Sequence, residues 1–174
     1  MKFDRPLVGS YPAYYDTYFR QVDDQGPLAL LMKQAQVGLL PFASLSDAEG
    51  ALRYAPGKWS VAEVLGHIND TERILAYRLL RLARFDATPL PGFEEDDFVR
   101  QGRFETRPLS ELYREWQTIR AATLSLVTSL TAEQLAFTGT ASGHPVSGLA
   151  LLWILPAHAA HHAAVVRERY LTVS

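Results

Sequence analysis

Cysteine is absent from this chain of 174 residues. Disulfides, cysteine-ligated zinc, iron–sulfur clusters and a cysteine nucleophile are therefore excluded. The sequence also lacks the GxGxxG, Walker A and GxSxG motifs, so dinucleotide, NTPase and serine-hydrolase chemistry have little support. Paired Glu-x-x-His motifs are missing as well, which argues against a di-iron helical bundle.

An excess of charge of one sign is also missing. The 17 Lys and Arg residues nearly balance the 19 Asp and Glu residues, for a formal net charge of -2. No strong field is available to attract nucleic acid or an acidic membrane. The first residues contain no apolar segment of a secretory signal, and we find no apolar run of the ~20 residues that cross a bilayer. We therefore expect a cytoplasmic protein that binds neither nucleic acid nor membranes.

Proline and glycine divide the chain into long segments with helical periodicity. The four longest predicted helices cover residues 27–40, 61–85, 108–130 and 149–171. A short aromatic helix is expected over 11–21, a long connection over 86–107, and a turn or small hairpin over 137–148. These elements predict an all-α, up-and-down four-helix bundle that forms a single domain over residues 1–174.

Three of the five histidines fall on apolar helix faces. With ~100° of rotation per residue, His158 and His162 lie about 40° apart on the inner face of the segment 149–171. His67 lies on the inner face of the segment 61–85. If these helices pack in register, three imidazoles meet inside the bundle.

Two histidines at positions i and i+4 let one helix give two ligands to one metal ion. A third histidine completes a three-nitrogen face, which leaves positions open for water or substrate as in catalytic sites. Spacing alone supports a cluster of hydrogen-bonded core histidines equally well, although every buried imidazole needs a polar partner. His144 lies in a glycine- and proline-containing segment and is expected to be exposed.

Other side chains have structural and functional interpretations. Arg78 and Arg81 lean toward the inner face of their helix and could bind an anionic group of a thiol cosubstrate. The favoured interpretation is that they pair with acidic residues such as Glu115. Trp59 precedes a helix start and is expected to pin the helix entry. The acidic run 94–97 is expected to be a solvated loop, although a long loop can also serve as a lid.

Several segments together resemble the DinB/YfiT-like superfamily of metal-binding four-helix bundles. They are 53–67 (RYAPGKWSVAEVLGH), 70–73 (DTER), 76–78 (AYR), 89–93 (PLPGF), and the ending from 158–162 (HAAHH) to 168–171 (ERYL). The resemblance implies that His67, His158 and His162 bind a divalent metal ion, nickel or zinc. It also implies thiol-S-transferase activity with bacillithiol, mycothiol-dependent chemistry or hydrolysis, since the family spans these functions.

One departure from the family concerns the acid–base group. Many relatives have an acidic or polar residue directly after the first histidine of the last pair, where this chain has Ala159 and Ala160. His161 is therefore the candidate for a proton-transfer or substrate-contacting role, and Asp70 is a second candidate. His161 lies about 100° around the helix from His162, so we do not expect it to bind the metal.

The leading hypothesis is a mononuclear divalent-metal enzyme that activates a thiol or water for transfer or hydrolysis. Its partner would be a small-molecule substrate, with or without a low-molecular-weight thiol. The alternatives are a non-enzymatic protein that binds metal or a small ligand under stress, and a structural bundle with hydrogen-bonded core histidines. The resemblance and the aromatic segment 11–19 also suggest a homodimer, although this segment could equally fold back on its own bundle.

Overall fold

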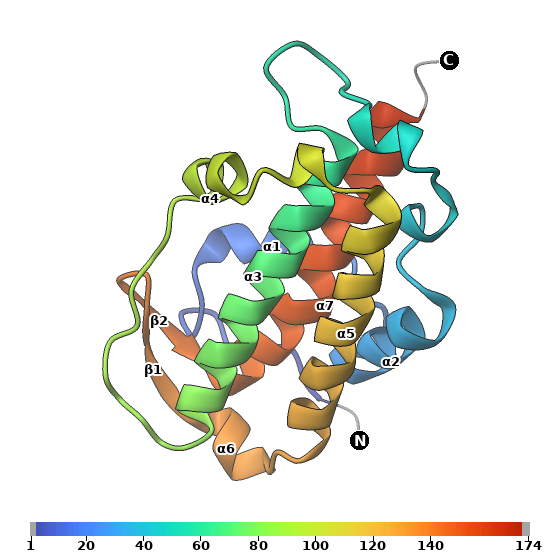
Figure 1. Ribbon diagram of the computed structural model, residues 1–174. Coiled ribbons are helices and arrows are strands. Elements are labelled where there is room, and N and C mark those ends of the chain that lie inside the picture. The colour runs from blue at the N-terminus through green and yellow to red at the C-terminus, as the bar shows by residue number, and fades with distance from the viewer. Residues whose placement is uncertain (1–2, 172–174) are drawn as a thin grey trace.

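Four long helices pack side by side in the computed structural model, which describes residues 3–171 (Figure 1). These helices are α2 (Pro27–Val37), α3 (Val61–Leu82), α5 (Leu109–Thr128) and α7 (Gly148–Val165), which continues into a π-helical turn at Val166–Tyr170. The shorter elements are α1 (Asp16–Phe19), α4 (Glu95–Gly102), α6 (Ala132–Ala136), β1 (Thr138–Ala141), β2 (His144–Ser147), and 3-10 turns at Ala13–Tyr15, Phe42–Ser44, Ala48–Ala51 and Phe104–Thr106. The predicted four-helix bundle is confirmed.

Local sequence signals explain where these helices begin. Ser60 and Glu63 form a reciprocal capping box at the start of α3, and Thr131 and Gln134 form another at the start of α6. Each box satisfies two main-chain N–H groups that lack a partner within the helix. Pro27 occupies the first turn of α2, where its missing N–H costs nothing.

The order of helix directions is not a simple alternation. Helices α3 and α5 run the same way along the bundle, and α7 runs against both (Figure 1). Contacts follow this arrangement, because Asn69 donates to the Leu112 carbonyl and Glu72, further along α3, pairs with Arg120. The connection between α3 and α5 is long enough to return to the starting end of the bundle, so the two helices can be parallel.

The connection over 86–107 contains an unexpected helix. The acidic run 94–97 is not a solvated loop, because it forms the N-cap and first turn of α4 (Glu95–Gly102). Carboxylates are favoured there, since they interact with the positive end of the helix dipole and with free N–H groups. Val99 anchors α4 to the protein, being 2% exposed.

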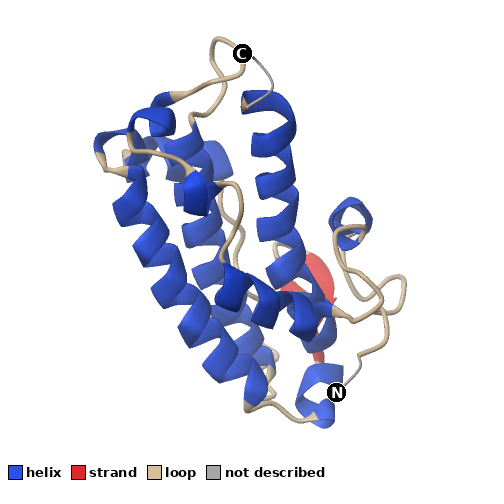
Figure 2. Cartoon of the chain, turned by 90° about the vertical axis from the view of Figure 1, so that its right-hand side faces the viewer, coloured by secondary structure: helices blue, strands red, loops and turns tan. Residues whose placement is uncertain are grey.

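The small sheet is a two-stranded hairpin beside the bundle (Figure 2). Strands β1 and β2 pair antiparallel, and the turn residues Ser142 and Gly143 both have positive φ angles, 52° and 78°. Two-residue hairpin turns require this backbone, which glycine adopts without strain. Leu90 in the connection exchanges main-chain hydrogen bonds with Thr140 and Ser142, so the hairpin holds the connection in place.

The aromatic N-terminal segment folds back on its own bundle. Helix α1 packs against α7, where the Phe19 ring lies 5.5 Å from the Trp153 ring. Tyr11 and Phe19 are buried in the same hydrophobic cluster. The aromatic segment 11–19 is therefore no longer an argument for a dimer. The homodimer stays a prediction that rests on the family resemblance.

Helix α7 is the core helix of the protein. With its π-helical turn it covers Gly148–Tyr170, 23 residues that are long and apolar enough to cross a membrane by length and composition. The expectation that no segment meets this test is therefore wrong. However, 72% of its most apolar window is buried inside the protein, and α7 contacts α1, α2, α3 and α6. Its apolar character is explained by this burial.

A polar layer divides the hydrophobic core into two clusters. One cluster contains Leu75 and Leu79 of α3, and the other contains Leu65 and Ile68. Between them Arg120 donates hydrogen bonds to both Glu72 and Gln34, and Gln34 Nε2 donates to the Pro156 carbonyl at 3.1 Å. The layer thus joins α2, α3, α5 and α7 at one level, next to the histidines.

Candidate metal centre

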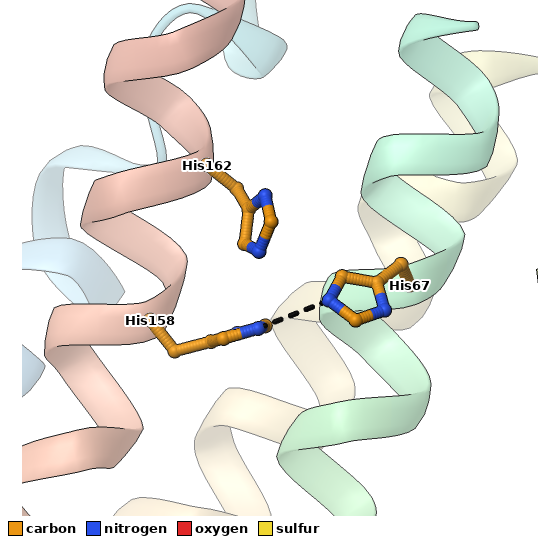
Figure 3. A group of neighbouring side chains, drawn as sticks. All are labelled: His67, His158 and His162. Atoms are coloured by element: carbon orange, nitrogen blue, oxygen red, sulfur yellow. Dashed lines mark hydrogen bonds between the residues drawn. The ribbon is translucent and has the colours of Figure 1, made fainter. Parts of the chain in front are cut away.

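Three histidines from two helices meet inside the bundle. His67 comes from the second turn of α3, and His158 and His162 come from successive turns of α7 (Figure 3). His67 Nε2 and His158 Nε2 are 3.1 Å apart, and one nitrogen from each of the three rings lies within 4.8 Å of the others. The structure therefore brings together the three residues that helical periodicity placed on inner faces.

Burial keeps these imidazoles neutral at physiological pH. Desolvation lowers the pKa of His67 to about 4, against a small opposing effect of the Asp96 carboxylate. The pKa values of His158 and His162 are also lowered, first by burial and then by the neighbouring imidazoles. Neutral imidazoles have the free lone pairs that a metal ion requires.

The donor set fits a divalent transition-metal ion. Tetrahedral zinc with Zn–N distances of ~2.0–2.1 Å holds its nitrogen ligands about 3.3 Å apart, close to the 3.1 Å between His67 Nε2 and His158 Nε2. Nitrogen ligands suit zinc, nickel and copper better than magnesium or calcium, which prefer oxygen. Three protein ligands also leave a position open, as in catalytic zinc sites.

Two residues of the surrounding structure hold the His67 ring. Thr71, one turn further along α3, places its Oγ1 3.5 Å from His67 Nδ1. The Trp59 ring lies 4.9 Å from the His67 ring, and its Nε1 donates to Asp96 Oδ1 at 3.1 Å. Trp59 therefore links the site to α4, a role that its position before the helix cap did not reveal. Groups that fix a ligand ring in this way tune metal sites strongly.

His161 lies beside the cluster but outside it. Its ring lies 4.4 Å from the Tyr18 ring and 5.2 Å from the His162 ring. The group of nitrogen atoms that could share one ion does not include His161. Burial lowers its pKa, with a further contribution from Arg169, so it can accept a proton near the site.

Asp70 is not placed with the histidines. It follows His67 by three residues, which turns it about 60° away from the His67 direction, and its carboxylate contacts Arg73 at 3.4 Å. Arg73 also pairs with Glu115 at 2.6 Å, so these residues link α3 to α5. The structure gives no support to an acid–base role of Asp70, and the predicted pairing of Glu115 with Arg78 is wrong because Arg73 takes that place.

Two cavities border the cluster, and the first turn of α4 contributes one lining residue to each. The larger, of about 360 Å³, is lined by His161 and His162 together with Trp59, Asp96 and other residues of α7 and the loop before α3. The smaller, of about 220 Å³, is bordered by His158. Asp96 borders the larger cavity and Glu95 the smaller one. The histidines are thus accessible from two sides.

Sequence comparison assigns the chain to a family. A profile of the DinB superfamily matches residues 32–166. The chain belongs to this superfamily. A protein of Oceanobacillus iheyensis, named as a candidate metal-dependent hydrolase, is 28% identical over 127 residues, which are 71% of this chain and 72% of the relative.

Structural comparison finds the DinB fold in solved structures. YfiT from Bacillus subtilis, described as a candidate metal-dependent hydrolase with an unusual four-helix bundle topology, matches with a TM-score of 0.67 and 19% identity over 95% of this chain and 90% of YfiT. The mycothiol-dependent maleylpyruvate isomerase matches with a TM-score of 0.67 and 15% identity over 84% of this chain and 61% of that enzyme. At these identities the matches establish the common fold.

Some site residues were not found from the sequence. Tyr18 lies 5.9 Å from the His158 ring and 6.4 Å from the His162 ring, and the aromatic composition of its segment was the only available signal. Asp96 reaches the site because α4 forms, and the acidic run did not reveal that helix. Both residues come from segments whose position depends on long-range packing.

Proposed function

We propose that this DinB protein is a mononuclear divalent-metal enzyme, with the ion held by His67, His158 and His162. The observation that carries the proposal is the convergence of three neutral imidazole nitrogens within 4.8 Å of one another. The Oceanobacillus iheyensis relative, named as a candidate metal-dependent hydrolase, supports a metal-dependent enzyme. Zinc or nickel is the proposed ion, because both accept nitrogen ligands.

The chemistry supplied by such an ion is activation of a nucleophile, since it lowers the pKa of a bound water or thiol toward neutrality. The protein's own residues hold the ligand rings in place and accept a proton. Thr71 and Trp59 fix the His67 ring, and the burial of His67 and His158 shields that side of the site from bulk water. His161, with its lowered pKa and its contact with His162, is the proposed proton acceptor at the edge of the larger cavity.

Transfer to or from a small thiol is the finer proposal. The two cavities that border the histidines can hold two reactants at one centre, one in each cavity. The maleylpyruvate isomerase that shares this fold is described as mycothiol-dependent, which supports thiol chemistry on such a bundle. We assign the thiol to the larger cavity, next to His161, and the electrophilic substrate to the smaller one.

Hydrolysis is the second candidate, favoured by the name of the relative of 28% identity. One assay distinguishes thiol transfer from hydrolysis. Zinc- or nickel-loaded protein is incubated with the electrophile monochlorobimane in the presence and absence of bacillithiol, mycothiol or cysteine, and with a panel of esters and amides. Thiol-dependent conjugation that is lost in the His158→Ala variant supports transfer, whereas ester or amide cleavage without thiol supports hydrolysis.

A non-enzymatic binding protein is the remaining alternative. It predicts stoichiometric metal binding with neither activity in these assays. A cytoplasmic location is expected from the sequence alone. A homodimer is expected from the family resemblance. Light scattering at micromolar concentration tests it, and the mass of a single chain, 19.4 kDa, would contradict it.

A further inference from the structure

Two arginines are buried in the bundle, and they differ in their partners. Arg120 is 1% exposed and forms a bidentate ion pair with Glu72. Arg78 is 6% exposed, and no ion pair within residues 3–171 includes it. Burial of a charge without a counter-charge is costly, and buried arginines normally have an anionic partner. The environment of Arg78 is therefore that of an anion-binding residue.

The hydrogen bonds of Arg78 hold its guanidinium in a fixed position. Nη2 donates to the Pro91 carbonyl at 2.8 Å and to Ser142 Oγ at 2.9 Å. Nε and Nη1 make no hydrogen bond to the described part of the chain. Both fixed partners are neutral, so they orient the side chain and leave its charge uncompensated. Desolvation by burial lowers the pKa of Arg78.

Arg78 and His158 border the same cavity. His67, Thr71, Leu75 and Arg78 follow one another along one face of α3, about 16 Å from first to last along the helix axis. The cavity of about 220 Å³ lies along this face, with Thr71, Leu75, Arg78 and His158 among its lining residues. Arg78 and His158 therefore face one common space.

Phenol and hydroxyl groups line the space between these two ends. Tyr14, Tyr15 and Tyr18 cover the cavity from the N-terminal segment, and Ser142 and His144 border it from the hairpin. The one acidic residue among its lining side chains is Glu95, which is exposed at the first turn of α4. Glu95 belongs to none of the ion pairs within residues 3–171, so it does not neutralise the guanidinium.

We propose that Arg78 binds the carboxylate of the substrate, so that the smaller cavity selects small carboxylic acids whose reactive atom lies beside His158. The assignment of this cavity to a substrate rests on the proposed function. The planar guanidinium favours a carboxylate, since its N–H groups match two coplanar oxygens. Glu95 across the cavity disfavours a doubly charged phosphate by repulsion. The volume of about 220 Å³ is below the ~300 Å³ of a site for a drug-sized ligand, so the acid is small.

The test measures binding to metal-free protein, so that a carboxylate cannot bind to the ion instead. Chelator-treated protein is titrated with hexanoate, with its neutral isostere hexanamide and with inorganic phosphate, and followed by calorimetry and ligand-observed NMR. We expect hexanoate to bind at least ten-fold more tightly than hexanamide or phosphate. Equal affinity for hexanoate and hexanamide, or no binding of hexanoate, would overturn the proposal. Tighter binding of phosphate than of hexanoate would overturn the assignment to carboxylic acids.

Variants identify the group that binds the carboxylate. Arg78→Gln is expected to remove the preference for hexanoate over hexanamide. Arg78→Lys is expected to retain part of this preference, because lysine keeps the charge but lacks the paired N–H groups that match both carboxylate oxygens. The matched control is Arg81→Gln, one turn further along α3, where Arg81 pairs with Asp86 and Tyr77. Unchanged hexanoate affinity in Arg78→Gln would overturn the proposal. If Arg78→Gln does not fold, the proposal is tested by the hexanoate affinity of Arg78→Lys and by the comparison of hexanoate with hexanamide in the wild-type protein.

The same variants separate this proposal from the metal site. Arg78→Gln is expected to bind zinc with unchanged stoichiometry, because Arg78 is about three turns from His67 along α3. Failure of the wild-type protein to bind zinc would contradict the proposed function and leave the hexanoate result standing. Absence of the preference for hexanoate in the wild-type protein, with intact zinc binding, would contradict the role of Arg78 alone.

Discussion

Glu72 and Arg120 form a bidentate ion pair in the centre of the bundle. Arg120 Nε lies 2.9 Å from Glu72 Oε1, and Arg120 Nη2 lies 2.7 Å from Glu72 Oε2. Both side chains are almost completely buried, at 1% and 2% exposure. The pair lies beside the histidines, since the Arg120 charge contributes to the lowered pKa of His158. The stability of the protein and the electrostatics of its site therefore depend on the same two residues.

Removal of one partner is expected to destabilise the fold strongly. Glu72→Gln leaves the buried Arg120 without its counter-charge, so we expect the free energy of unfolding to fall by ~3–5 kcal/mol. Urea denaturation measures the change. Glu111→Gln is the control, because its pair with Arg107 is exposed, and such pairs contribute only ~0–1 kcal/mol. Equal effects of the two substitutions would contradict this account of the pair.

Metal binding is expected to depend on the three clustered histidines and not on the others. His67→Ala, His158→Ala and His162→Ala should each reduce zinc or nickel affinity by at least ten-fold, because two imidazoles hold an ion far less well than three. His144→Ala, which changes an exposed histidine of the hairpin, should bind like the wild type. Isothermal titration with each ion provides the measurement, and wild-type affinity in a cluster variant would remove that residue from the site.

His161 is expected to affect turnover without holding the ion. Its ring contacts His162 and Tyr18, and loss of such a neighbour typically costs ~10–100-fold in activity or affinity. We therefore expect His161→Ala to retain about one metal per chain and to lose activity in the thiol-transfer assay. A crystal structure with a His161 nitrogen at ~2.1 Å from the ion would show that the assignment is wrong.

Metal-free protein is expected to lose stability as the pH falls from ~6.5 to about 4. Burial lowers the pKa of His67 to about 4 in the folded state, whereas an unfolded histidine titrates near ~6.5. Within this window the unfolded chain binds a proton that the folded chain does not, so the free energy of unfolding decreases as the pH falls. The stability that neutral His67 contributes is fully present above pH ~6.5.

Thermal unfolding at a series of pH values tests this dependence. His67→Gln is expected to reduce the slope of the curve between pH ~6.5 and 4, since its side chain does not titrate there, whereas His158 and His162 still contribute. His144→Gln serves as the control because it lies outside the cluster. A melting temperature that rises on acidification through this window would contradict the expected sign.

The histidine cluster could be predicted because it depends on regular geometry. Periodicity placed His158 and His162 one turn apart on an inner face, and antiparallel packing of α7 on α3 brings them to His67. The parallel direction of α3 and α5 was not predictable in the same way, because helices of either direction bury similar apolar faces. The length of the connection over 86–107 permits both arrangements.

The partners of Arg78 illustrate what the sequence did not reveal. Its hydrogen bonds to Pro91 and Ser142 arise where the connection and the hairpin turn come together. Pro91 lies 13 positions from Arg78 and Ser142 lies 64 positions from it, with no regular periodicity to relate them. Arg73 is one turn closer to the start of α3 and faces Glu115 on α5. The choice between the two arginines as the partner of Glu115 depended on the packing angle of two helices.

The hydrogen bond from Gln34 to the Pro156 carbonyl has a consequence for the position of the ligand histidines. It ties the main chain of α7, two residues before His158, to a side chain of α2. A shift of α7 by one residue would move it ~1.5 Å and turn it ~100°, which would carry both histidines away from His67. The position of α7 along its own axis is thus fixed by a hydrogen bond that involves none of the three histidines. The fold therefore sets the relative position of the three imidazoles before any ion enters.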